Sequence, residues 1–115
     1  MHEISLVRNV FRSLEDQFSA EELEKIKAIH LKIGLLANVE PVLLRNAYEA
    51  VTATDQPGFK AVSLEIEMVP AEISCPSCGK TSIIENYHFK CSHCNQPSNN
   101  LIRGTELLIS GVDMD

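Results

Sequence analysis

The sequence predicts an α+β fold in which two helices pack on a three-stranded sheet and a four-cysteine module is inserted between two of the strands. Three observations lead to this prediction. Two segments carry apolar residues at three- and four-residue spacing, three segments alternate apolar with polar residues, and every cysteine lies between Cys75 and Cys94. Amphipathic helices need an apolar surface to cover, and half-buried strands provide one.

The first helix and the first strand follow one another at the start of the chain. A helix is expected over residues 4–19, because one apolar stripe recurs there at helical spacing. The stripe consists of Val7, Val10, Phe11, Leu14 and Phe18. Residues 25–33 alternate, with Ile29 and Leu31 on one face, which predicts a strand with one side facing water.

The second helix is expected over residues 41–53, where Pro41 suits the first helical position. Residues 60–69 alternate apolar and polar side chains and predict the second strand. The third strand is expected over residues 105–112, after the cysteine-containing segment. The chain therefore leaves one sheet and returns to it, which predicts a body of residues 1–70 plus 105–115 and a module of residues 71–104.

The four cysteines form two identical pairs, separated by twelve residues: Cys75-x2-Cys78 and Cys91-x2-Cys94. Two such turns facing each other make a tetrahedral all-sulfur cage, which suits zinc in a zinc-ribbon module. Gly79 and Asn95 follow the pairs and tolerate the positive φ that the end of such a turn needs. Two disulfides are the alternative reading of the same spacing.

Composition bears on location and on partners. Residues 1–20 carry three acidic residues and resemble no signal peptide, and no segment approaches the roughly 18 apolar residues of a membrane span. We therefore expect a cytoplasmic protein, in which thiolates bind metal rather than form disulfides. The net charge is −6, with 16 acidic against 10 basic residues, so the basic footprint of a nucleic-acid-binding protein is missing.

The chain begins Met1-His2-Glu3, a pattern with its own metal chemistry. The α-amine, the amide nitrogens of His2 and Glu3, and the His2 imidazole lie within a few bonds of each other. Four nitrogens in a plane suit Ni(II) or Cu(II) rather than tetrahedral zinc. The alternative is a flexible terminus with an incidental histidine.

Taken together, these motifs resemble the HypA/HybF family of nickel metallochaperones, which help to mature [NiFe]-hydrogenase and, in some bacteria, urease. The resemblance covers essentially the whole chain: MHE at the start, Gly34-x5-Glu40-Pro41 before the second helix, CPSCG, CSHC and GTELLI. It implies a nickel site at the N-terminus and a separate structural zinc. The residues themselves predict no enzymatic activity, because the sequence has no cysteine outside the two pairs and no Gly-rich phosphate loop. The resemblance also implies three kinds of partner: a HypB-type GTPase, the hydrogenase large subunit and urease accessory proteins.

Carried over by position, the resemblance implies that His2 supplies imidazole and amide nitrogens and that Glu3 supplies an amide nitrogen. A carboxylate before the second helix completes the site in some members. Here that position is Glu40, where several members carry aspartate. The implied zinc ligands are Cys75, Cys78, Cys91 and Cys94.

Two other functions remain open on the sequence alone. One is a zinc-ribbon protein-interaction module without nickel delivery, and the other is a small nucleic-acid-associated zinc protein, which the acidic charge disfavours. His30 is expected on a sheet face rather than in a metal site. His88 and His93 lie inside the module, where four cysteines already close the cage. Two roles stay open for them: passing zinc-site geometry or metal state to the nickel site, and lending that site a further ligand.

Overall fold

The computed structural model describes residues 3–115, and its long helices and strands follow the predicted order. The chain forms two compact units. Of the described residues, the first unit consists of 3–31, Asn38–Glu67 and Leu108–Asp115, and the second of Lys32–Ala37 and Met68–Leu107. The assignment of a nickel role to one unit and a zinc role to the other stays a prediction.

The N-terminal segment forms two helices, where one was predicted. The first, α1 (Glu3–Gln17), ends before the predicted residue 19, and the short α2 (Ala20–Leu23) follows. The reason is a capping box. Ser19 is extended, its hydroxyl accepts the Glu22 N–H at 3.2 Å, and its own N–H donates to the Glu22 carboxylate at 2.9 Å. Ser19 therefore starts a new helix instead of ending the old one.

The three predicted strands form one sheet in the order β2-β1-β6. They are β1 (Ile26–Gly34), β2 (Ser63–Val69) and β6 (Leu107–Met114). β2 starts three residues later than predicted, because the 3-10 turn η1 (Pro57–Phe59) holds the preceding backbone: the Val62 N–H donates to the Phe59 carbonyl at 3.0 Å. β6 begins at Leu107 rather than at residue 105, because the Glu106 carboxylate accepts the Gly104 N–H in a turn.

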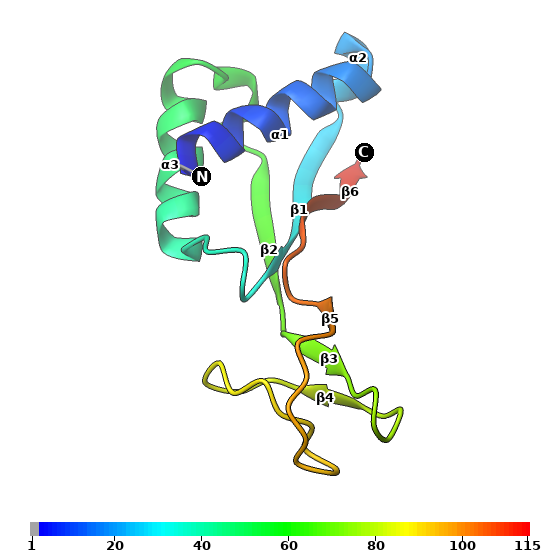
Figure 1. Ribbon diagram of the computed structural model, residues 1–115. Helices are drawn as coiled ribbons and strands as arrows, with labels where there is room; N and C mark the ends of the chain where they lie inside the picture. Colours follow the sequence, from blue (N-terminus) through cyan, green and yellow to red (C-terminus); the bar gives the residue numbers. More distant parts are fainter. Residues whose placement is uncertain (1–2) are drawn as a thin grey trace. The chain divides into compact units, whose positions relative to one another are not determined.

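In the first unit α1 packs against α3 (Pro41–Thr54), and the two helices meet in Figure 1. Phe11 of α1 stacks on Tyr48 of α3 with ring centroids 5.7 Å apart and contacts Phe59 at 4.7 Å. The Tyr48 hydroxyl donates to the Val62 carbonyl at 2.9 Å, and burial raises the pKa of Tyr48 to about 12, so it stays a donor. Offset aromatic contacts of this kind add about 1 kcal/mol each to area burial.

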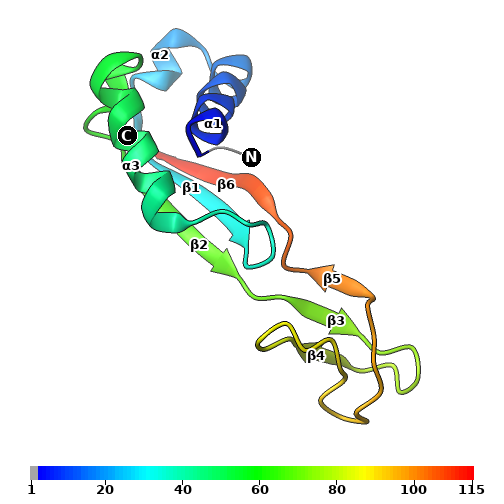
Figure 2. The same ribbon diagram turned by 60° about the vertical axis from the view of Figure 1, so that its left-hand side comes forward.

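The second unit has its own small antiparallel sheet, in the order β4-β3-β5 (Figure 2). Its strands are β3 (Glu72–Ser74), β4 (Thr81–Ile83) and β5 (Leu101–Arg103). Ala71, Ile73 and Ile84 form the core, with Leu36 and Leu101 packed against them. The sequence did not predict these strands, because three residues are too few to show an alternation.

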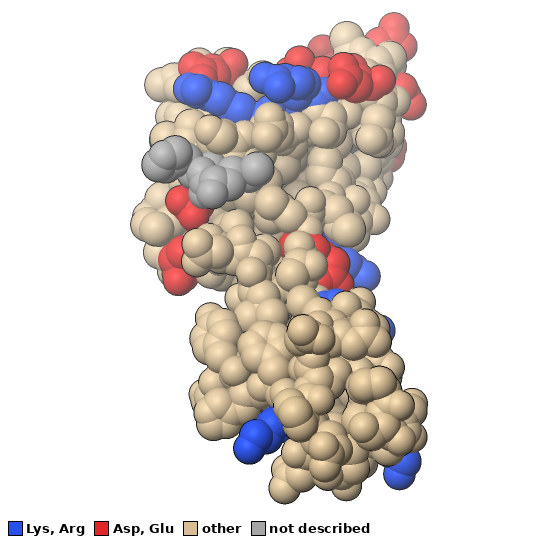
Figure 3. Space-filling model, viewed as in Figure 1, with Lys and Arg blue, Asp and Glu red and all other residues tan. Residues whose placement is uncertain are grey.

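The surface of the first unit mixes acidic and basic side chains on the face seen in Figure 3. On that face the second unit shows few charged side chains, and the described residues form no continuous basic patch there. No helix within residues 3–115 is both long enough and apolar enough to cross a membrane.

Replacing Gly34 with alanine is expected to destabilise the second unit. A Cβ atom at this position would overlap the backbone carbonyl of Gly104 and the Thr105 nitrogen, neither of which belongs to a movable side chain. Overpacking against backbone costs about 3 kcal/mol, which corresponds to a fall in melting temperature of roughly 10 °C. Gly58→Ala is the control, because nothing lies within 4 Å of its added Cβ. Thermal unfolding monitored by circular dichroism measures both melting temperatures. Equal values for the two variants would contradict this packing.

Candidate metal centres

The four cysteines lie in two turns with the same hydrogen-bond pattern. In the first, the Cys75 N–H donates to the Lys80 carbonyl and the Gly79 N–H donates to the Cys75 carbonyl, at 2.9 and 2.8 Å. In the second, the Cys91 N–H donates to Gln96 and the Asn95 N–H donates to Cys91, both at 2.9 Å. Gly79 and Asn95 have φ of 74° and 66°, which confirms the positive φ predicted for both. The sequence repeat is therefore also a structural repeat.

The four sulfur atoms converge on one point. Their Sγ atoms all lie within 4.8 Å of one another, and the shortest distances cross between the turns: 3.5 Å from Cys75 to Cys94 and 3.6 Å from Cys78 to Cys91. A disulfide would need about 2.05 Å, so all four cysteines are free thiols here. A tetrahedron of sulfurs around zinc at about 2.3 Å has edges of about 3.8 Å. The geometry of the cage therefore fits one zinc ion.

The cage is also electrostatically prepared for thiolates. Burial alone raises the pKa of Cys91, but N–H donors at Cys94 and His93 and the Ser82 hydroxyl outweigh it and lower that pKa to about 6. At Cys94 the Gln96 N–H lowers the pKa, but the neighbouring sulfurs and burial raise it to about 12. Four adjacent sulfurs cannot all ionise without a cation between them, and a divalent metal supplies that charge.

Ser82 is a residue that the sequence did not single out. Its side chain is buried in β4, donates to Cys91 Sγ at 3.7 Å and accepts the Ser92 N–H at 3.0 Å. It ties the second cysteine turn to the small sheet. No local pattern could have revealed it, because the contact joins residues nine and ten positions apart across the fold.

Two of the three residues predicted for nickel, Glu3 and Glu40, lie in the first unit. Glu3 is the first residue of α1 and lines a hollow of about 500 Å³ with Ile4 and, from α3, Leu43, Asn46, Ala47 and Ala50. Glu40 is the N-cap of α3, with its carboxylate 3.5 Å from the Val42 N–H. The predicted ligand His2 lies outside the described residues. Among residues 3–115, the four cysteines form the one group of three or more Cys, His, Asp or Glu side chains that could surround a single ion.

The remaining histidines lie in three different settings. His30 projects from β1, and its Nε2 is 2.9 Å from an Asp113 carboxylate oxygen, as expected of a sheet-face residue. The His93 main chain donates to Cys91 Sγ at 3.4 Å. His88 closes the turn that starts at Glu85, with its N–H donating to the Glu85 carbonyl at 3.0 Å.

Comparisons with known proteins agree with one another. A family model described as "Hydrogenase/urease nickel incorporation, metallochaperone, hypA" matches residues 1–114. The chain is 30% identical over 115 residues to hydrogenase maturation factor HypA of Desulfitobacterium hafniense, covering 100% of this chain and 99% of that protein. It is 35% identical over 114 residues to HypA of Chloroflexus aggregans, covering 98% of each.

Solved structures show the same fold. The solution structure of the Ni metallochaperone HypA from Helicobacter pylori matches with a TM-score of 0.67 at 21% identity, over 99% of this chain and 97% of that one. A second solution structure of a HypA protein matches with a TM-score of 0.67 at 22% identity, over 99% and 96%. At these identities the likeness shows the fold alone.

Proposed function

Because this chain belongs to the HypA family of hydrogenase/urease nickel-incorporation metallochaperones, we propose that it binds one Ni(II) ion near its N-terminus and delivers it during [NiFe]-hydrogenase maturation. The family consists of maturation factors, so the chain is a metallochaperone and not an enzyme. The observation that carries the proposal is the family match over residues 1–114, which includes the Met1-His2-Glu3 segment.

The proposed nickel ligands come from two places in the sequence. His2 supplies its imidazole and amide nitrogens, Glu3 supplies an amide nitrogen, and in a protein that starts at Met1 the α-amine completes a planar set. Glu40 adds a carboxylate. Its contact with the Val42 N–H is long for a hydrogen bond at 3.5 Å, so the carboxylate keeps acceptor capacity for a cation.

The proposed role of the second site is structural. Cys75, Cys78, Cys91 and Cys94 would hold Zn(II), which would cross-link the two turns. Four thiolates complete a tetrahedral site and leave no open position for a second ligand. Such a cage holds its metal too firmly for a cargo that must be released, which favours a separate nickel site.

We propose delivery by ligand exchange in the cytoplasm. Nickel held by a few nitrogens can pass to a receiving site one ligand at a time, and a dissociation constant of about 1 µM corresponds to roughly 8 kcal/mol of binding free energy. The proposed partners are a HypB-type GTPase, which provides the nucleotide hydrolysis, and the [NiFe]-hydrogenase large subunit or urease accessory proteins as recipients.

Metal stoichiometry tests this proposal. Protein with a free N-terminus should contain one zinc after purification and take up one further nickel, measured by mass spectrometry of the native protein. Zinc alone, with no nickel taken up at 100 µM, would favour the zinc-ribbon interaction module. Co-purification with the GTPase and the hydrogenase large subunit then separates hydrogenase from urease maturation.

Glu40→Ala is expected to weaken nickel binding about tenfold, which corresponds to about 1.4 kcal/mol, with the zinc content unchanged. Glu40→Asp should have a milder effect. Aspartate is a good N-cap and keeps α3 capped, so this variant changes only how far the carboxylate extends. Titration calorimetry on both variants provides the measurement. Wild-type nickel affinity in Glu40→Ala would remove this residue from the site.

A further inference from the structure

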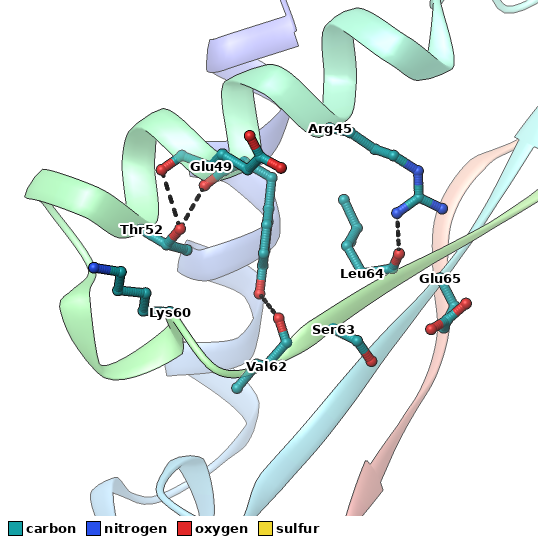
Figure 4. Close-up of a pocket in the computed structure, with 9 residues that line it drawn as sticks. Arg45, Glu49, Thr52, Lys60, Val62, Ser63, Leu64 and Glu65 are labelled. Atoms are coloured by element: carbon teal, nitrogen blue, oxygen red, sulfur yellow. Dashed lines mark hydrogen bonds between the residues drawn. The ribbon is translucent and has the colours of Figure 1, made fainter.

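A buried hydroxyl in the second unit lies against the cysteine cage. Ser82 is the middle residue of β4, is only 5% exposed, and has its Oγ atom 3.7 Å from Cys91 Sγ. Side chains elsewhere reach main-chain groups instead, as Arg45 of α3 does when it donates to the Leu64 carbonyl of β2 at 2.6 Å (Figure 4). The Arg45 contact stabilises the fold, whereas the Ser82 contact also reaches a candidate metal ligand.

The partners of Ser82 determine where its hydroxyl proton points. A serine hydroxyl can donate one hydrogen bond and accept two. Ser92 fills both acceptor positions, with its N–H nitrogen 3.0 Å and its hydroxyl oxygen 3.1 Å from Ser82 Oγ. The Ser82 proton is therefore left for Cys91 Sγ, and a thiolate there accepts it more strongly than a neutral group would.

This contact makes the two cysteine turns unequal. Cys75 and Cys91 occupy equivalent places in the turns, both are buried, and main-chain N–H groups of each turn point to their sulfurs. Cys91 also accepts the Ser82 hydroxyl, and in the part of the chain that the structure describes no other cysteine sulfur has a hydroxyl donor. Cys78, by contrast, is exposed. Cys91 is therefore the most firmly held of the four ligands, and Cys78 is the most accessible.

The surroundings of Cys91 show what the hydroxyl excludes. Ser82, Cys91 and Ser92 are among the residues that line a hollow of about 560 Å³. Water or a small reagent can enter a hollow of this size. Because Cys91 is nevertheless 0% exposed, its neighbours, Ser82 among them, cover its sulfur on this side. A cage that released its metal at Cys91 would first have to break this contact, whereas Cys78 already meets solvent.

We propose that Ser82 is a positioning residue of the metal cage, whose hydroxyl makes Cys91 the last ligand to dissociate and leaves Cys78 as the first. Hydrogen-bond partners of metal ligands orient those ligands and typically contribute about 10–100-fold to metal affinity. An exposed ligand without such a partner exchanges with water more readily. The inference rests on the proposed Zn(II) in the cage and not on nickel delivery, so the two are tested separately.

Two variants of the same shape test the hydroxyl. Ser82→Thr keeps it, whereas Ser82→Val introduces the same β-branched shape without it. Competition with a chromogenic chelator should show a zinc affinity about tenfold lower in Ser82→Val than in Ser82→Thr, which should stay within about threefold of the wild type. Ser92→Ala is a further control, because the Ser82 hydroxyl remains, and it should bind zinc like the wild type.

Two further readouts report on the sulfur atoms themselves, because valine also leaves the Ser92 N–H without its acceptor. The cadmium-113 NMR signal of cadmium-loaded protein responds to hydrogen bonds at the coordinating sulfurs. It should be the same in the wild type and Ser82→Thr and displaced in Ser82→Val. Limited alkylation of zinc-loaded protein with N-ethylmaleimide should label Cys78 first and Cys91 last in the wild type, and should reach Cys91 earlier in Ser82→Val.

Three results would overturn the proposal. One is equal zinc affinity in Ser82→Thr and Ser82→Val, which would leave the hydroxyl without a role. Another is a cadmium signal that is the same in all three proteins, whatever their zinc affinities are. The last is labelling of Cys91 before Cys78 in the wild type. A wild type that binds neither zinc nor cadmium would overturn the proposed cage itself, and this inference with it.

Discussion

Replacing His2 with alanine is expected to lower the affinity for Ni(II) at least about 100-fold, or about 2.7 kcal/mol, without unfolding the protein. The imidazole closes a chelate ring with the adjacent backbone nitrogens, and its loss leaves nickel with weaker donors. Residue 2 precedes α1, whose buried stripe begins at Leu6, so the fold should not depend on it. Calorimetric titration and the absorption band of planar Ni(II) measure the change. His30→Ala is the control, because that ring is already paired with Asp113.

The same site predicts an effect of pH and of tags. An amide nitrogen binds nickel only after losing its proton, so binding should release protons and strengthen as the pH rises. A tag at the N-terminus should impair binding by blocking the amine, and a C-terminal tag should leave it unchanged. If N-tagged, C-tagged and His2→Ala proteins all bound one nickel equally well, the N-terminal site would be wrong.

The long helices and strands could be predicted because the spacing of their apolar residues follows which side chains are buried. The stripe from Val7 to Leu14 is the buried face of α1, and the alternation around Ile29 and Leu31 is the buried face of β1. Ends were less accurate, since they depend on single contacts such as the Ser19–Glu22 capping box. The three-residue strands of the second unit carried no periodic signal and follow from the small core around Ile73.

The candidate sites were likewise predictable from the sequence only in part. The cysteine cage could be predicted because ligand spacing is local and each turn is stabilised by its own hydrogen bonds. The support given by Ser82 could not, since it depends on how β4 packs against the second turn. The exposure of the apolar strand β6 could not be predicted either, because the sequence shows that Leu108 and Val112 are apolar but not whether another element covers them.

Loss of one of the four proposed zinc ligands is expected to unfold the second unit while sparing the first. Cys75→Ala removes a sulfur from a residue that is 1% exposed and directly follows β3. The remaining core of this unit consists of a few small and aliphatic side chains, and units of about 40 residues usually need a metal or disulfides to fold. Structural zinc contributes about 10–16 kcal/mol in small zinc domains, far more than such a core.

Zinc content should therefore fall below about 0.1 per chain in Cys75→Ala or Cys94→Ala, by analogy with zinc-dependent folding of small domains. Amides in residues 71–104 should lose their protection from hydrogen exchange. Amides of α1 and α3 should keep theirs, because Phe11, Tyr48 and Phe59 form a core within the first unit. Ser77→Ala, an exposed change in the same turn, should retain zinc and protection.

A nitrogen or oxygen ligand in the X-ray absorption spectrum of the wild type would contradict the all-sulfur cage. If α1 and α3 lost their protection at the same time, zinc would support the whole chain. The separate aromatic core predicts the opposite: nickel binding at the N-terminus should persist after the cysteine cage is lost.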